Sequence, residues 1–217
     1  MHEPSNQSLE LEIARALEYD IVFGRLSPGE RLREENIAQR LSASRHHVRS
    51  ALMQLENAGI IVRERNKGAR VQAYSAEEVH QLYDVRGMLT RQAALRIKLP
   101  VAQHLLADVE AAQVKYEAAL NVVHLPTIQE TNDLFHSEFF KLCGNPYLVD
   151  LLKRLMNRTY VIRAANLANP SHFSKSCAEH RNIIALLAGT DSWALSELCV
   201  AHLLPSKVAY LEKLEKT

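Results

Sequence analysis

The sequence predicts a mainly α-helical fold, with an N-terminal winged helix-turn-helix followed by a C-terminal antiparallel bundle made only of helices. Three observations support this fold class. Glycine and proline are scarce, with seven of each in 217 residues, and so few helix breakers favour helices. Apolar residues recur at helical spacing along most of the chain but alternate between residues 60 and 72. Two short helical segments joined by a tight link precede the alternating stretch.

The first helix is predicted over residues 8–23. Ile13, Leu17 and Ile21 recur every four residues and form one apolar stripe. Gly24 can end this helix in a left-handed conformation. A turn is expected before the next helix, where serine, proline and glycine are adjacent.

A pair of helices with a tight link is predicted next. A short helix over 34–41 is followed by a link at Ser42 and Ala43, and Ser44 is a suitable N-cap for the second helix of the pair. Gly59 ends that second helix. Its apolar residues lie at i, i+3, i+4 and i+7 and mark the buried face: Val48, Ala51, Leu52 and Leu55.

A β-hairpin, the wing, completes the N-terminal domain. Residues 60–64 and 69–72 alternate in polarity and predict two short strands, with a turn over 66–68 between them. The domain boundary is predicted directly after this hairpin, which gives domains 1–73 and 76–217.

The C-terminal domain is predicted to be entirely helical. Ser75 and Glu78 form a capping box at the start of a long helix that ends before Pro100. Pro205 lies inside the last predicted helix and should kink or break it. The remaining helices are predicted over residues 101–123, 127–143, 147–167, 172–187 and 191–214.

Charge is balanced overall but uneven along the chain. The net charge is only +1, so the whole composition is not that of a basic nucleic-acid-binding protein. Between residues 31 and 70, however, basic residues clearly outnumber acidic ones. A solvated charged face is one interpretation of that stretch, and a DNA contact is the other.

The sequence predicts a cytoplasmic protein with no membrane partner. Cys143, Cys177 and Cys199 form no close pair and suit a reducing compartment. No apolar run approaches the roughly 20 residues of a membrane span. The N-terminus lacks the basic start and apolar core of a signal peptide.

The second helix of the pair is predicted to enter the DNA major groove by its N-terminal end. The face opposite its apolar residues presents a polar set: Arg45, His46, His47, Arg49 and Ser50. Arg45 and Arg49 are four residues apart and project from the same side. Arginine forks suit guanine edges and phosphates. The wing adds Lys67 beside Gly68, where the backbone can approach DNA closely. The alternative is that these arginines are merely exposed helix residues.

At this point the sequence resembles the GntR family of bacterial regulators. The resemblance implies that Ser44, Arg45, His46, His47 and Arg49 contact DNA, with Lys67 and Gly68 in the minor groove or on the backbone. The matched positions are Pro28-Gly29-Glu30-Arg31-Leu32, Ile37-Ala38, Leu41, Ser44-Arg45, Val48-Arg49, Ala51-Leu52, Leu55-Glu56 and Gly59, and in the wing Asn66, Gly68, Ala69 and Val71.

Several positions depart from that family pattern. The link usually has glycine where Ser42 stands, and Thr-Pro or a similar pair is common where His46 and His47 stand. Glutamate often occupies the position of Ser50, and arginine often occupies that of Glu35. These departures affect the expected operator sequence and leave the docking mode unchanged.

Histidines form a second constellation in the C-terminal half. Asn132 and His136 are four apart and share a helix face, while His180 and His202 lie at similar distances on either side of a predicted turn. One amide oxygen and three imidazoles can complete a site for zinc or a related transition metal. The alternative from spacing is a set of core histidines that hydrogen-bond to neighbours. His172 is interpreted as a surface or packing residue.

The second domain resembles the helical sensor domain, called FCD, of the FadR-type branch of GntR regulators. The resemblance implies that Asn132, His136, His180 and His202 hold a divalent metal at the floor of an effector pocket, with zinc expected and nickel or manganese as alternatives. Aspartate is commoner at the first position, and the neutral Asn132 should weaken binding. The number of predicted helices resembles the smaller VanR-like variant. The matching residues are Asn132 to His136 with Phe135, Gly144-Asn145, Glu179-His180 and His202-Leu203.

The resemblance also implies a small organic acid as effector. Arg86 and Arg163 are the candidate carboxylate-binding residues, and the alternative for each is a surface ion pair. Relatives often have glutamate where Thr90 stands. The expected partners are a pseudopalindromic DNA operator and a second copy of this chain.

Two other functions compete with a ligand-responsive repressor. A constitutive DNA-binding protein with an inert dimerisation domain would bind neither metal nor effector. A metalloenzyme that uses the three histidines is disfavoured, because no glutamate or aspartate lies in a recognised hydrolase motif that would supply a general base.

Overall fold

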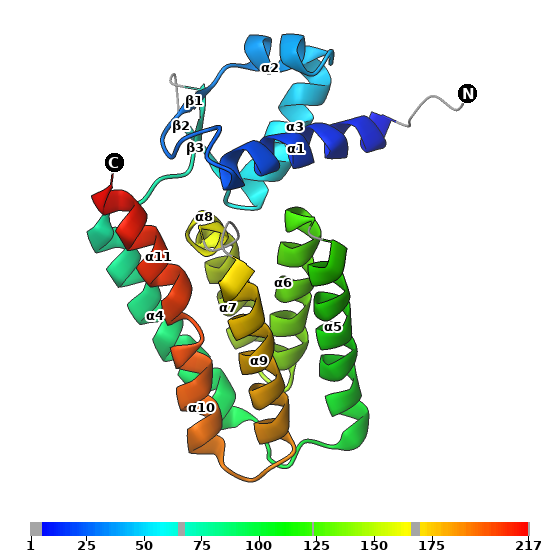
Figure 1. The fold of residues 1–217 in the computed structure, drawn as a ribbon, viewed down its shortest axis with the longest axis vertical. Helices are drawn as coiled ribbons and strands as arrows, with labels where there is room; N and C mark the ends of the chain where they lie inside the picture. The colour runs from blue at the N-terminus through cyan, green and yellow to red at the C-terminus, as the bar shows by residue number, and fades with distance from the viewer. Residues whose placement is uncertain (1–5, 65–67, 123, 166–169, 217) are drawn as a thin grey trace. The chain divides into compact units, whose positions relative to one another are not determined.

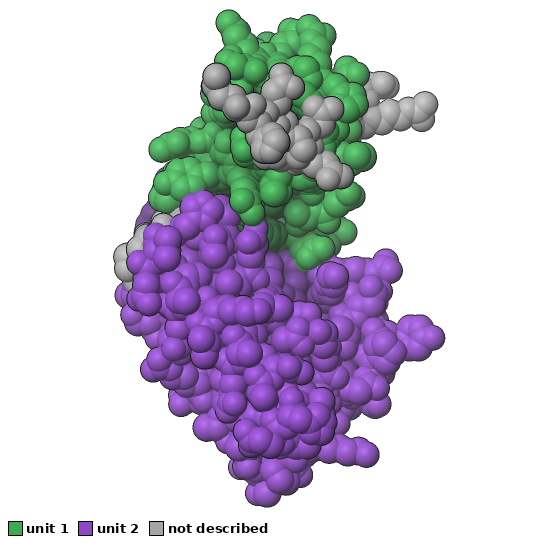
Figure 2. Space-filling model, turned by 90° about the vertical axis from the view of Figure 1, so that its right-hand side faces the viewer, with its two compact units in different colours: residues 1–74, 157–161 green, residues 75–156, 162–217 purple. Residues whose placement is uncertain are grey.

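The computed structural model describes residues 6–64, 68–122, 124–165 and 170–216 (Figure 1). They divide into two compact units, coloured separately in Figure 2. The first unit takes its described residues from 1–74 and 157–161, and the second from 75–156 and 162–217. The N-terminal unit combines helices with a small sheet, and the second unit is helical, as the sequence predicts.

The N-terminal unit begins with three helices and three short strands. Strand β3 lies between the other two, in the order β1-β3-β2, and both pairings are antiparallel. The sequence does not predict β1, because two residues are too few to show an alternating pattern. The elements are α1 (Asn6–Val22), β1 (Arg31–Leu32), α2 (Glu34–Arg40), α3 (Arg45–Asn57), β2 (Ile61–Glu64) and β3 (Gly68–Val71).

Helix α3 is held by its predicted apolar face. Val48, Ala51, Leu52 and Leu55 are all buried, and α3 packs against α1, whose Leu17 is fully buried. Fixing this face against the core forces the opposite face of α3 outward, and that outward face carries the candidate DNA-contacting residues.

The predicted helix ends are confirmed. Gly24 and Gly59 follow α1 and α3 with positive φ angles of 72° and 75°. Ser42, in the link between α2 and α3, also has a positive φ of 50°. This conformation is energetically unfavourable for any residue that has a Cβ atom. The family resemblance places glycine at this position, and the backbone conformation explains why.

The C-terminal part of the chain is helical throughout its described residues. The Ser75 side chain caps α4 by accepting the backbone N–H of Glu78. The Glu78 carboxylate accepts the backbone N–H of Ser75 at 2.8 Å, which confirms the capping box. The helices are α4 (Ala76–Arg96), α5 (Gln103–Val122), α6 (Leu125–Lys141), α7 (Pro146–Arg158), α8 (Tyr160–Ala164), α9 (Pro170–Leu187), α10 (Ser192–Ala201) and α11 (Leu204–Glu215).

The structure divides two of the long predicted helices, and the sequence predicts only the second of these breaks. The helix expected over 147–167 is interrupted after Arg158, and the short α8 follows. The helix expected over 191–214 breaks between α10 and α11. Pro205 occupies the first turn of α11, where a missing backbone N–H leaves no hydrogen bond unmade, so the predicted break is confirmed.

The core of the second unit positions the histidines. Helix α5 packs against α6 and α9, and α10 packs against α4 and α9. Phe135 and Phe139 on α6 are buried together with Ile183 and Leu187 on α9. In the parts of the chain that the structure describes, no helix combines the length and the apolar character needed to cross a membrane.

Candidate DNA-reading helix and metal-binding pocket

The N-terminal turn of α3 is capped and exposed. The Ser44 side chain accepts the backbone N–H of His47 at 3.2 Å and lies 3.0 Å from Nδ1 of the same residue. Arg45 and Arg49 follow on the exposed face, with more than half of each side chain open to solvent. The cap fixes the helix start, so the exposed turn offers both arginine forks and backbone amides to a phosphate.

Both arginines form ion pairs with the first turn of α2. Nη2 of Arg45 lies 2.7 Å from Oε1 of Glu35, and Nε of Arg49 lies 2.8 Å from Oε2 of Glu34. Exposed pairs of this kind contribute little stability, about 0–1 kcal/mol. A DNA phosphate can therefore replace either glutamate at low cost. These pairs were not predicted, although Glu35 was identified as a departure from the family pattern.

The wing is described only in part. Gly68 has a positive φ of 80°, which the absence of a Cβ permits, and it pairs with Glu64 across the hairpin. Lys67, predicted to contact DNA beside it, lies outside the described residues.

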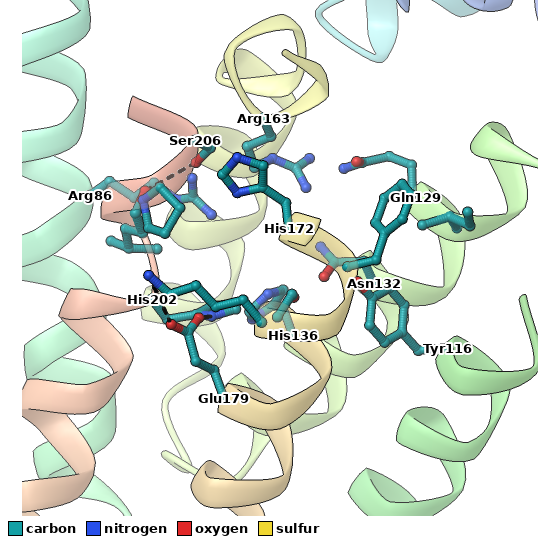
Figure 3. Close-up of a pocket in the computed structure, with 16 residues that line it drawn as sticks. Arg86, Tyr116, Gln129, Asn132, His136, Arg163, His172, Glu179, His202 and Ser206 are labelled. Atoms are coloured by element: carbon teal, nitrogen blue, oxygen red, sulfur yellow. Dashed lines mark hydrogen bonds and ion pairs between the residues drawn. The ribbon is translucent and has the colours of Figure 1, made fainter. Parts of the chain in front are cut away.

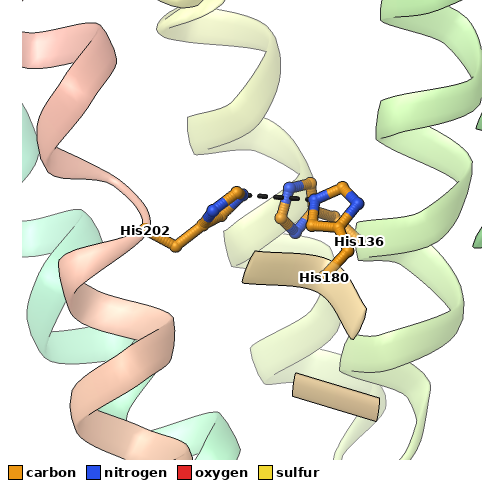
Figure 4. A group of neighbouring side chains, drawn as sticks. All are labelled: His136, His180 and His202. Carbon is orange, nitrogen blue, oxygen red and sulfur yellow. Dashed lines mark hydrogen bonds between the residues drawn. The ribbon is translucent and has the colours of Figure 1, made fainter. Parts of the chain in front are cut away.

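Three histidines from separate helices converge in the second unit (Figure 4). His136 comes from α6, His180 from α9 and His202 from the C-cap of α10. One ring nitrogen from each lies within 4.8 Å of the others. His136 and His180 are buried and His202 is half-buried, so the cluster is largely removed from solvent.

Hydrogen bonds orient two of these rings. Nδ1 of His202 lies 2.6 Å from Oε2 of Glu179, and Nδ1 of His180 lies 2.9 Å from Oε1 of Gln113. The two Nε2 atoms face one another at 3.3 Å. Both rings therefore use Nδ1 for a protein partner and turn Nε2 toward the centre of the cluster.

Burial disfavours the charged form of two of the histidines, His136 and His180. Burial lowers the pKa of His136 and of His180 well below the usual value, and the neighbouring His202 lowers both further. A neutral imidazole keeps the lone pair that a metal needs. Three imidazoles at this spacing fit zinc or a similar transition metal.

A small cavity of about 90 Å³ opens beside the cluster (Figure 3). His136 and His202 line it, and so does Asn132, one turn before His136 on α6. His180 is fully buried next to these rings and does not line the cavity. His172 lines it as well, whereas the sequence analysis interprets it as a surface or packing residue.

Two arginines also line this cavity, and their surroundings differ. Arg163 is ion-paired with Asp133 through both oxygens of that carboxylate, the second contact being 3.1 Å from Nη2. Arg86 is 4% exposed, and its Nη1 has no hydrogen-bond partner among the described residues. Burial lowers the Arg86 pKa, although Tyr83 beside it opposes that shift. Buried arginine without a carboxylate partner is costly unless an anion binds.

Comparison with known proteins assigns the family. Residues 9–71 match the bacterial regulatory proteins of the gntR family, and residues 81–204 match the FCD domain, which alone spans more than half of the chain.

The chain belongs to the GntR family.

Its relatives match along nearly their whole length. The transcriptional repressor GlaR of Escherichia coli K12 is 25% identical over 207 residues, which cover 88% of this chain and 90% of GlaR. The regulator YdhC of Bacillus subtilis is 23% identical over 196 residues, which cover 88% of this chain and 86% of YdhC. A GntR regulator structure from Rhodococcus sp. RHA1 superimposes with a TM-score of 0.68 at 21% identity, covering 94% of this chain and 97% of that one.

As a GntR-family protein, the chain is a DNA-binding transcriptional regulator and not an enzyme. The fold class and family predicted from the sequence are confirmed. The domain limits and the individual site residues remain predictions. The structure does bring the three histidines together and places Asn132, Arg86 and Arg163 around one cavity.

Some residues around the cluster could not be found from the sequence. Gln113 contacts His180 across 67 positions, and no local motif marks such a pair. Glu179 is adjacent to His180 in the matched family segment, but its hydrogen bond to His202 depends on how α9 packs against α10. Only the folded packing identifies these two residues as histidine partners.

Proposed function

We propose that this GntR-family regulator is a ligand-responsive repressor whose helical domain binds one divalent transition metal and a small carboxylate. The observation that carries this proposal is the placement of Arg86 and the histidines on one cavity. Three imidazoles supply metal ligands, and Nη1 of the buried Arg86 has no hydrogen-bond partner among the described residues.

His136, His180 and His202 would hold the metal, with Asn132 as a neutral fourth ligand. Zinc is the first expectation, with nickel or manganese as alternatives. The bound ion would supply a Lewis-acid centre that a carboxylate can coordinate. Arg86 would donate hydrogen bonds to the same carboxylate, and Arg163, already paired with Asp133, would add positive charge at the cavity.

The DNA-binding half of the proposal rests on α3. Residues 1–73 would form the DNA-binding domain and 76–217 the sensing and dimerisation domain, in a homodimer that acts in the cytoplasm. Two copies of α3 would enter major grooves about 34 Å apart on a pseudopalindromic operator. The proposed DNA contacts are Ser44, Arg45, His46, His47, Arg49, Lys67 and Gly68.

Effector binding would shift the equilibrium between dimer conformations that fit the operator and those that do not. The effector needs a different affinity for the two conformations, and the size of that difference sets the response.

A thermal-shift screen of small carboxylic acids, with and without zinc, tests the sensing half. We expect zinc to stabilise the metal-stripped protein and one class of acid to add further stability, about 2.7 kcal/mol at 100 times its dissociation constant. His136→Ala should lose both effects. His104→Ala, an exposed histidine on α5, should keep them.

An unaltered zinc effect in His136→Ala would reject the proposed site. Stabilisation by neither zinc nor any acid in the wild type would favour a constitutive DNA-binding protein with an inert helical domain.

A further inference from the structure

A chain of hydrogen bonds leads from His180 away from the cavity to the surface of the helical unit. Oε1 of Gln113 lies 2.9 Å from Nδ1 of His180, and Nε2 of Gln113 donates to Oε1 of Glu117 at 2.9 Å. Glu117 in turn accepts from Nε of Arg181 at 2.9 Å. None of Gln113, Glu117 and Arg181 lines the cavity.

The charge at the outer end sets the direction of every bond in the chain. Arg181 and Gln113 hydrogen bonds lower the pKa of Glu117 to about 2, so its carboxylate is ionised and can only accept. The amide of Gln113 must therefore present its NH₂ group to Glu117. Cys177 Sγ lies 3.4 Å from the same NH₂ group and also accepts a hydrogen bond from it.

Rotating that amide would be unfavourable. Gln113 is 4% exposed, so water cannot compensate for a lost bond. A rotated amide would direct its oxygen at the Glu117 carboxylate, and two acceptors would face each other. The observed orientation leaves Oε1 facing His180, so Nδ1 of His180 carries the hydrogen and donates it.

The ring tautomer follows from this bond. A neutral imidazole carries one hydrogen, and with that hydrogen on Nδ1 the lone pair of His180 lies on Nε2. That Nε2 faces Nε2 of His202 at 3.3 Å. His202 has an equivalent partner, because the Glu179 carboxylate accepts from its Nδ1 at 2.6 Å.

We propose that Gln113, supported by Glu117, and Glu179 are positioning residues that fix the tautomers of His180 and His202 so that both Nε2 lone pairs are directed at a metal ion. The inference rests on the proposed metal site for its functional meaning. Protein groups behind metal-binding histidines set ligand orientation and basicity, and their loss weakens metal affinity about 10- to 100-fold.

A purely structural role for Gln113 is the competing explanation. It would make Gln113 a buried polar residue that joins α5 to α9, with no influence on the imidazole. The two explanations differ in the tautomer of His180, which stability measurements do not report.

The test uses the full-length protein labelled with ¹⁵N-histidine and stripped of metal. Long-range ¹H–¹⁵N correlation spectra distinguish a histidine protonated on Nδ1 from one protonated on Nε2. We expect His180 to carry its hydrogen on Nδ1 in the wild type. Gln113→Leu, which keeps a similar volume but removes the acceptor, should give a mixture of both tautomers.

Zinc affinity provides the second measurement, by competition with a chromophoric chelator. Gln113→Leu should bind zinc about 10- to 100-fold more weakly than the wild type. The double variant Gln113→Glu with Glu117→Gln restores an acceptor for His180 and a donor beside it, and should recover most of that loss. Glu138→Gln, which breaks an exposed ion pair with Lys141, is the matched surface control and should bind zinc normally.

A wild-type His180 protonated on Nε2 would overturn the inference, whatever the metal affinity. So would unchanged zinc affinity in Gln113→Leu when His136→Ala abolishes binding, and that result would leave the metal site itself intact. Failure of the proposed function looks different, since His136→Ala would then bind zinc as tightly as the wild type. The tautomer measurement needs no metal and decides the inference in that case too.

Discussion

The arginines of the two candidate sites differ in burial and in their partners. On α3, Arg45 and Arg49 are exposed, and each already has a glutamate partner from the neighbouring helix. In the cavity, Arg86 is buried, and its Nη1 has no partner among the described residues. Solvent makes the exposed pairs cheap to break, whereas burial makes an unpaired cation costly to leave alone.

The difference indicates what each site needs from its ligand. DNA phosphates and base edges can replace the glutamates on α3, so binding there is an exchange of partners. An anion that enters the cavity meets a cation that the described protein groups leave incompletely satisfied. Sequence neighbours build the first site, whereas helices far apart in the sequence assemble the second.

The largest expected effect is at Arg86. Arg86→Leu should weaken binding of the acid selected in the thermal-shift screen by about 2–5 kcal/mol, because the buried partner of the acid's carboxylate is lost. The same change should not lower the free energy of unfolding of the ligand-free protein, since it removes a buried charge whose Nη1 has no hydrogen-bond partner among the described residues. Calorimetric titration and chemical denaturation measure the two quantities.

Arg91→Leu is the matched control on the same helix. Arg91 is partly exposed and paired with Glu197 at 2.8 Å, so acid affinity should be unchanged in this variant. Equal losses of acid affinity in both variants would show that α4 is perturbed as a whole and that Arg86 has no special role.

Arg49→Ala addresses the exposed site and should cost about 1–3 kcal/mol of operator affinity. The guanidinium is lost from the proposed groove-facing side of α3, while the buried face is untouched. Fluorescence anisotropy with labelled operator measures the loss. Arg154→Ala, which removes another exposed arginine, paired with Asp150 on α7, should leave operator affinity unaltered. Full operator affinity in Arg49→Ala would count against the docking of α3.

These two sites also differ in how far the sequence could predict them. The buried face of α3, its Ser44 cap and its exposed arginines follow from local spacing, which is why they were predicted correctly. The convergence of His136, His180 and His202 was expected mainly from the family resemblance. Spacing alone favours ordinary core histidines that hydrogen-bond to their neighbours.

What the sequence missed has a common physical origin. Strand β1 exists because two residues pair with β3 at a distance of some forty positions, and nothing local requires it. The break between α7 and α8 has no proline or glycine to mark it. The partners of the histidine rings, Gln113 and Glu179, depend on helix packing in the same way.

Ser42→Gly should stabilise the N-terminal unit by about 0.5–1 kcal/mol, since glycine adopts the observed positive φ without a Cβ penalty. The adjacent Ala43→Gly should destabilise it by a similar amount, because Ala43 has no positive φ to relieve. Urea denaturation compares the two variants. If both lower the midpoint, Ser42 is not strained, and the family preference for glycine there needs another cause.

The smallest expected effect is at the acid beside Arg45. Glu35→Gln should raise operator affinity about two- to threefold, because Arg45 then has no ion pair with residue 35 to break before it binds a phosphate. Glu77→Gln, an exposed acid in the first turn of α4, should leave operator affinity unchanged. Lower affinity in Glu35→Gln would mean that the glutamate orients Arg45 for DNA and does not compete with it.

The central claim is that three histidines of one chain form a metal site beside a buried arginine. Titration of zinc into the metal-stripped full-length protein by calorimetry tests it most directly. One zinc ion should bind per chain, and His136→Ala should abolish that binding while His104→Ala retains it. A wild-type protein that binds no zinc, nickel or manganese, or a His136→Ala variant that binds zinc as tightly as the wild type, would contradict the account.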